Sequence, residues 1–168
     1  VYKEDDKTKE LTLNIGKLIE GAVLCNDSVY AKSQSRIIGD PTEGAMVVLG
    51  EKLGVHKDVL NTKHPRIKEI PFDSDRKLMS TFHNISNEYT MYTKGAPDEL
   101  LKRCDKIYKN GEVEALTESD REAILAANED FAAKALRVLG VAYKTVADLD
   151  NFENEEHGLI YTGLMCMI

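Results

Sequence analysis

The spacing of apolar residues changes along this chain, and that change limits the possible folds more than any other feature. Near the start, apolar residues recur on one helical face, namely Leu11, Ile15, Leu18, Ile19, Ala22 and Val23. From Ile67 to Phe72, successive side chains alternate between the two faces of an expected strand. A helical period followed by an alternating one predicts helices packed against a sheet.

Two pairs of the later strand-like segments are joined by short polar turns. The later segments are residues 77–83, 88–94, 106–108, 112–114, 137–143 and 159–168. The first two are joined near Asn84–Asn87, and the next two flank Asn110-Gly111, the strongest short hairpin signal. Because hairpins join antiparallel strands and parallel strands need long crossovers, we predict an α+β fold: an antiparallel β-sheet flanked by helices.

The helix signals around this sheet are local. We expect the first helix to end near Asn26 and residues 27–39 to form a loop. Thr42 is expected to cap the second helix, with Glu43 in its first turn, where a carboxylate suits the helix dipole. The buried face of that helix is predicted as Ala45, Val48, Leu49 and Leu53. Thr117 and Asp120 form a capping box that predicts a further long helix.

Composition excludes several classes of function. The 168 residues carry a net charge of −7, which argues against a nucleic-acid or anionic-membrane surface. No stretch reaches the ~20 apolar residues that span a bilayer. The three cysteines form no CxxC pair, and Asp73-Ser74-Asp75 lacks further ligands at calcium-loop spacing, so we expect no metal site. The chain starts with Val1 and not Met, which suggests a fragment.

A nucleotide would have to be held mainly through its base. The chain has neither a GxxxxGK[ST] loop nor a GxGxxG segment after a strand, the usual phosphate-binding loops. Phe72 stands where an expected strand ends, so its ring could offer a face to a purine. Stacking of a base on an aromatic ring contributes ~1–3 kcal/mol in nucleic-acid proteins. The alternative is an ordinary core phenylalanine.

Four other candidate residues accompany that ring. Lys77 and Lys94 supply two ammonium groups that suit a triphosphate, although strand-end lysines are usually just solvated. Gly95 would let a backbone approach a ligand closely, or it is a turn glycine ahead of a helix starting at Pro97. Glu43 could accept from an adenine amino group, or it only stabilises the helix dipole.

Arg137 stands at the start of an apolar strand. A guanidinium in that position needs a partner, because an unpaired buried charge is costly. A phosphate and a carboxylate are equally suitable on chemical grounds. No residue is predicted to be catalytic.

Four segments carry a resemblance to a known family. They read DPTEGA from Asp40, PFDSDRK from Pro71, YTKGAP from Tyr92 and ALRVLG from Ala135. In this order and spacing they resemble the nucleotide-binding domain of P-type cation-transporting ATPases, most closely the calcium-pump branch, over essentially the whole chain.

The resemblance implies a role for each matching residue. Glu43 is similar to the acid near the adenine, and Phe72 to the ring that stacks on it. Lys77 and Lys94 match the lysines beside the base and along the nucleotide, and Arg137 matches the arginine that reaches the phosphates. One position departs from the pattern: Ser74 stands where muscle-type calcium pumps carry an arginine.

The resemblance also implies what surrounds such a domain. The chain has no DKTGT segment to be phosphorylated and no TGES segment to remove the phosphate. Residues 1–168 are therefore expected to be a single nucleotide-binding domain excised from a larger membrane pump, on the cytoplasmic side of the membrane. ATP would be its ligand, with magnesium in the full-length pump. Its partners would be the phosphorylation and actuator domains of the same parent chain.

In that setting the domain presents the γ-phosphate of ATP to an aspartate elsewhere, and the isolated chain is expected to lack turnover. Because such domains are insertions, residues 1–3 and 166–168 should lie close together. Two other classes stay open. One is a free-standing ATP-using enzyme, and the other is a protein-interaction module that docks through the acidic residues 148–156.

Overall fold

The computed structural model describes the backbone of residues 6–109 and 111–168, and the side chains from Leu13 onward except Asn110. The expected closeness of residues 1–3 to the other end of the chain therefore lies outside the described residues. No helix among the described residues is long and apolar enough to cross a membrane.

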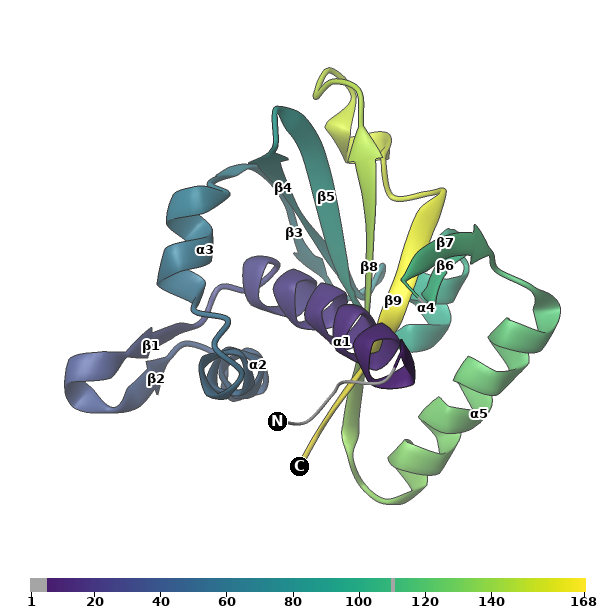
Figure 1. Ribbon diagram of the computed structural model, residues 1–168, viewed down its shortest axis with the longest axis horizontal. Coiled ribbons are helices and arrows are strands. Elements are labelled where there is room, and N and C mark those ends of the chain that lie inside the picture. The colour runs from purple at the N-terminus through teal and green to yellow at the C-terminus, as the bar shows by residue number, and fades with distance from the viewer. Residues whose placement is uncertain (1–5, 110) are drawn as a thin grey trace.

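A seven-stranded sheet forms the centre of the molecule (Figure 1). In spatial order its strands are β3 (Arg66–Asp73), β4 (Leu78–Ile85), β5 (Glu88–Gly95), β8 (Arg137–Val146), β9 (Leu159–Met167), β6 (Cys104–Lys109) and β7 (Glu112–Ala115). Neighbouring strands run antiparallel except β6 and β9, which pair in parallel. The predicted α+β class with a sheet flanked by helices is confirmed.

Helices cover both faces of this sheet. The described helices are α1 (Asp6–Leu24), α2 (Pro41–Lys52), α3 (Lys57–Lys63), α4 (Pro97–Leu101) and α5 (Glu118–Ala133). Figure 1 shows α1 lying across one face of the sheet. The small hairpin of β1 (Val29–Ala31) and β2 (Arg36–Ile38) lies next to α2 and away from the seven-stranded sheet. Short 3₁₀ turns occupy Lys32–Gln34 and Phe152–Asn154.

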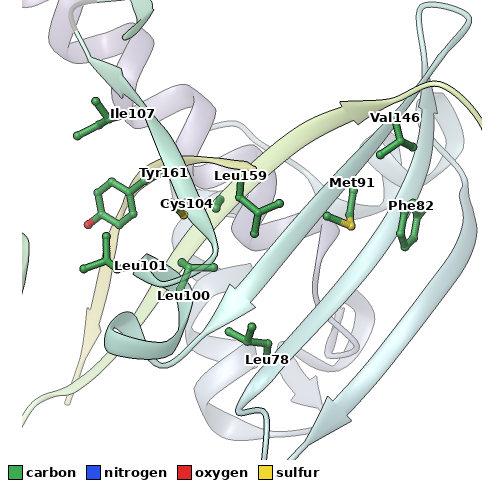
Figure 2. Packing of buried hydrophobic residues seen from close by; sticks show 11 residues of the cluster. Leu78, Phe82, Met91, Leu100, Leu101, Cys104, Ile107, Val146, Leu159 and Tyr161 are labelled. Carbon is green, nitrogen blue, oxygen red and sulfur yellow. The ribbon is translucent and has the colours of Figure 1, made fainter. Parts of the chain in front are cut away.

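The two faces bury different cores because adjacent strand residues point to opposite sides. In β5, Met91 packs with Leu100 and Leu101 of α4, in the cluster shown in Figure 2. Its neighbour Tyr92 packs on the other face with Leu24 and Cys25, at the end of α1. The sheet therefore separates a side built by α4 and α5 from a side built by α1 and α2.

The segment before and within α2 differs from expectation. Residues 27–39 contain the β1–β2 hairpin and are not a featureless loop. The helix is capped by Asp40, whose Oδ1 accepts from the backbone N–H groups of Thr42 and Glu43, so the predicted cap at Thr42 is wrong by two positions.

The buried face of α2 also differs. It comprises Gly44, Met46, Val47 and Gly50, whereas Ala45, Leu49 and Leu53 are exposed. The prediction from apolar spacing failed here because the closest helix contacts are made through glycines.

The expected turns and the long capped helix are present. Ser86 and Asn87 both have positive φ, 52° and 62°, as a two-residue hairpin turn requires. The capping box of Thr117 and Asp120 starts α5, which has no fully buried residue. Helix α3 was not expected from the sequence.

Candidate functional site

A hollow of about 490 Å³ lies beside α2 at one end of strands β4, β5 and β8. Five of the six predicted ligand-binding residues line it, namely Glu43, Phe72, Lys94, Gly95 and Arg137. The rest of its lining is Asp27, Gly39, Asp40, Thr42, Met79 and Leu139. Segments that are distant in sequence thus meet at one concave surface.

Phe72 contributes an exposed aromatic ring. Its side chain is 62% exposed, so the interpretation as a core phenylalanine is wrong. The register of β3 against β4 shifts between Ile70, which faces Ser80, and Asp73, which faces Leu78. One extra residue therefore lies in β3 at Pro71–Phe72, and such a bulge redirects the side chains it carries. Proline fits a bulge in this edge strand because it has no N–H for the ladder.

Glu43 and Lys94 form a largely buried ion pair in the wall of the hollow. Lys94 Nζ lies 2.7 Å from Glu43 Oε1 and also donates to the Cys25 carbonyl at 2.6 Å. Glu43 Oε2 accepts from the Asp27 backbone N–H at 2.8 Å. The Lys94 side chain is only 5% exposed, so a solvated strand-end lysine is wrong.

This pair keeps hydrogen-bonding capacity. An ammonium carries three donors, of which Lys94 uses two. A carboxylate has about four acceptor positions, and two donors reach the Glu43 carboxylate. One donor and two acceptor positions therefore remain on side chains that line the hollow.

At Gly95, the neighbouring strand leaves no room for a side chain. A Cβ there would lie 2.7 Å from Leu78 Cδ2 and would clash with the Lys77 carbonyl oxygen. Gly95 pairs with Leu78 on one side and Gly140 on the other, so it belongs to β5 and not to a turn. Close packing of neighbouring strands requires the glycine.

Arg137 finds a hydroxyl where a phosphate or carboxylate was expected. Its Nη1 donates to Thr42 Oγ1 at 2.8 Å, and the side chain is exposed. Among the described residues, no carboxylate forms an ion pair with it. A guanidinium has five donors, so most of its capacity is available beside the hollow.

Lys77 is the predicted residue that the structure does not bring to the hollow. It lies in the turn after β3 with a φ of 61°, exposed, and its carbonyl accepts from the Ala96 N–H at 3.2 Å. Because its φ is left-handed, Lys77 does not continue the extended backbone of β4, and its side chain does not follow the alternation of the β4 residues.

Comparison with known proteins assigns the chain to a family. The family described as "P-type ATPase, cytoplasmic domain N" matches residues 14–168. The chain belongs to this family.

Relatives of this N domain are parts of much longer proteins. The chain is 46% identical over 155 residues to "Calcium-transporting ATPase 1" of Bacillus cereus and 42% identical over 153 residues to "Calcium-transporting ATPase 1" of Lactococcus lactis. It is 37% identical over 153 residues to "Cation-transporting ATPase pma1" of Synechocystis. These matches cover 90%, 90% and 87% of the chain, but only 17%, 17% and 16% of the relatives.

In this N domain, three cations hold the turn that follows α1. Lys94 donates to the carbonyl of Cys25, Arg66 to those of Leu24 and Asn26, and Lys57 to those of Asn26 and Ser28. Positive groups suit this place because a helix C-terminus carries partial negative charge.

The turn supplies part of the hollow's wall. Arg66 also binds Asp27 Oδ1 at 2.7 Å, and the Asn26 amide donates to the Glu43 carbonyl at 2.9 Å. Burial, assisted by the charge of Arg66, lowers the pKa of Lys57 to about 8. Burial raises the pKa of the Cys25 thiol, which donates to the Met79 carbonyl and stays protonated at neutral pH.

Sequence reasoning missed the rest of the lining. Asp40 could have been found as the residue before Pro41, because aspartate followed by proline is a common helix start. Met79 and Leu139 are apolar strand residues with no local signal that they border a hollow.

Proposed function

We propose that this chain binds ATP in the hollow, as the cytoplasmic nucleotide-binding domain of a P-type cation-transporting ATPase that transports calcium. One observation carries the proposal: an exposed Phe72 ring, beside a buried Glu43–Lys94 pair, borders a concave surface large enough for a nucleoside. Family membership and the names of the relatives support it.

In the proposed complex the adenine stacks on Phe72. Met79 and Leu139 supply further apolar surface in the same hollow. The remaining acceptor positions of Glu43 suit the adenine amino group, and the remaining donor of Lys94 suits a ring nitrogen or a ribose oxygen. Arg137, with donors to spare, would bind phosphate oxygens. Lys77 has no part in this arrangement.

The longer protein would use this domain to deliver phosphate. We propose that the γ-phosphate is presented to an aspartate of a separate phosphorylation domain when the two domains close, and that an actuator domain of the same parent chain takes part in the cycle. Magnesium would accompany the phosphates in the full-length pump. The fraction of its relatives that the chain covers, 17%, fits such a division of labour.

Titration of the chain with ATP, followed by amide chemical shifts, tests the proposal. We expect weak binding, with a Kd near the millimolar range, about −4 kcal/mol. The shifts should be largest around Phe72 and Lys94. Phe72→Ala should weaken binding by about 1–3 kcal/mol, which is at least about fivefold in Kd.

Val113→Ala is the matched control, because Val113 is an exposed apolar residue on β7, at the opposite edge of the sheet. It should leave the affinity unchanged. An unchanged affinity in Phe72→Ala would contradict the stacking role. Rapid ATP hydrolysis by the chain alone would favour a free-standing enzyme, and no response to any nucleotide would favour an interaction module.

A further inference from the structure

The turn between β3 and β4 is fastened by one arginine side chain. Arg76 Nη2 donates to the carbonyl of Pro71 at 2.9 Å and to that of Leu78 at 2.7 Å. It therefore ties the end of β3 to the start of β4, on both sides of the turn. A guanidinium suits this task because its donors are fixed in one plane.

The bulge in β3 explains why this fastening is needed. Between Ile70 and Asp73 the ladder to β4 is interrupted, and the residues in the gap are Pro71 and Phe72. A bulge leaves backbone groups without ladder partners. Arg76 supplies a donor to one of them, the Pro71 carbonyl that immediately precedes Phe72.

The arginine is itself held by a buried carboxylate from a distant part of the chain. Glu156, in the segment before β9, has a side chain only 4% exposed, and its Oε2 lies 2.8 Å from Arg76 Nε. Ser80 Oγ donates to Glu156 Oε1 at 2.8 Å. Arg103 Nη1 donates to the Glu156 carbonyl at 3.1 Å and lies 3.9 Å from Oε2. The contact between Arg76 Nε and Glu156 Oε2 is an ion pair without hydrogen-bond geometry. The hydrogen bond from Ser80 and the contacts with Arg103 hold the buried Glu156 carboxylate in place, so it can anchor the Arg76 guanidinium through charge.

Phe72 needs such support because burial cannot hold it. More than half of its side chain is exposed, so packing restrains the ring only weakly. A ligand that stacks on a mobile ring must spend binding free energy on ordering it, and a ring already held in place removes that cost.

We propose that Arg76, anchored by Glu156, is a positioning residue that fixes the β3 bulge and so holds the Phe72 ring toward the hollow. The proposal rests on the proposed nucleotide site for its function, but the fastening itself is a property of the ligand-free chain. Neither residue lines the hollow.

The first test needs no ligand. The backbone N–H groups of Asp75, Arg76 and Lys77 all donate to Asp73, so their hydrogen exchange reports on the turn. Arg76→Lys keeps the charge but loses the planar pair of donors. Glu156→Gln keeps the size of the anchor but removes its charge. Both variants should exchange faster at these amides. Unchanged exchange in both would overturn the proposal, whatever the chain binds.

The second test uses ATP and a double-mutant cycle. Arg76→Lys should raise the Kd by about threefold or more, and never by more than Phe72→Ala does. In a Phe72→Ala background, Arg76→Lys should have no further effect, because Arg76 acts through the ring. An equal loss in both backgrounds would overturn the positioning role and leave a merely structural one.

Arg121→Lys is the matched control. Arg121 also binds two backbone carbonyls, those of Leu101 and Cys104, each at 2.6 Å, and it does not line the hollow. It should lower stability without changing the ATP affinity or the exchange of residues 75–77. If Arg76→Lys does not fold, Glu156→Gln carries both tests. If no variant or parent binds ATP, the proposed function fails and the exchange data alone decide the fastening.

Discussion

The Glu43–Lys94 pair shows how single residues link stability to the site. Each member is largely buried, so removing one leaves an uncompensated charge. We expect Lys94→Met to destabilise the chain by about 3 kcal/mol. The double variant Glu43→Gln, Lys94→Met should recover part of that loss, because no charge is then left buried. Urea unfolding measures both. Lys102→Met, which breaks the exposed pair with Glu99, should change stability by less than about 1 kcal/mol.

His83 should make the fold sensitive to acid. Its ring is buried in β4, with Nδ1 2.9 Å from the His64 carbonyl and Nε2 2.8 Å from Thr81 Oγ1. Burial lowers the pKa of His83 from 6.5 to about 4, an effect that the hydrogen bond to His64 partly opposes. Between these values the unfolded chain binds more protons than the folded one, so stability falls as pH falls through this range.

The total expected loss from this histidine is about 3 kcal/mol between pH 7 and pH 4. Urea unfolding at several pH values measures it. His83→Gln should remove most of this acid-dependent loss, whereas His157→Gln, at an exposed position, should keep it. Equal pH dependence in all three proteins would show that His83 is not responsible.

At the scale of elements, sequence patterns predicted the hairpins and α5 correctly but failed for the buried face of α2, which contains glycines. Alternating periods, an Asn-Gly turn and a capping box predicted the sheet hairpins and α5, because those signals are local. Apolar spacing failed for α2, where Gly44 and Gly50 make the close contacts. A glycine contributes no hydrophobic signal, so such a face is visible only once its partner elements are in place.

A pair of glycine substitutions tests this view. A Cβ on Gly50 of α2 would lie 2.8 Å from both Val23 Cγ2 and the Val55 carbonyl oxygen, whereas a Cβ on Gly16 of α1 meets nothing within 4 Å. Alanine favours a helix over glycine by about 1 kcal/mol. Gly16→Ala should therefore stabilise the chain, and Gly50→Ala should destabilise it by about 1–3 kcal/mol through overpacking. Thermal unfolding distinguishes the two signs, and stabilisation by both would refute the close contact of α2 with α1.

For the site as well, residues marked by local motifs could be predicted from the sequence, whereas features that depend on the folded chain could not. Motifs placed Glu43, Phe72, Lys94, Gly95 and Arg137 in one group, and the structure brings these five together. Lys77 could not be excluded from the sequence, because its left-handed φ is a property of the folded turn between β3 and β4 and has no local signal at a lysine. The anchor of Arg76 was equally hidden, since Glu156 lies 80 positions further along the chain.

At the scale of the whole molecule, the sheet order decides what the hollow can bind. Strands β3, β4, β5 and β8 are neighbours, so residues 72, 79, 94, 95, 137 and 139 meet where these strands adjoin α2. The charged side chains that line the hollow are three carboxylates and two cations, the latter being Lys94 and Arg137. Lys94 is already paired with Glu43. This balance offers little net attraction to a triphosphate, so binding should depend on the base.

We therefore expect adenosine and ATP to bind this chain with Kd values within about tenfold of each other, a difference of at most about 1.4 kcal/mol. Ribose 5-phosphate, which has no base to stack on Phe72, should not bind measurably. Amide chemical shifts on titration with each ligand measure this order, and added salt should weaken ATP binding only slightly, because few cations take part. Arg137→Gln should reduce the affinity for ATP but not for adenosine. If ATP bound more than about a hundredfold tighter than adenosine, phosphate contacts would dominate, and the ligand would have to reach cations beyond those that line the hollow.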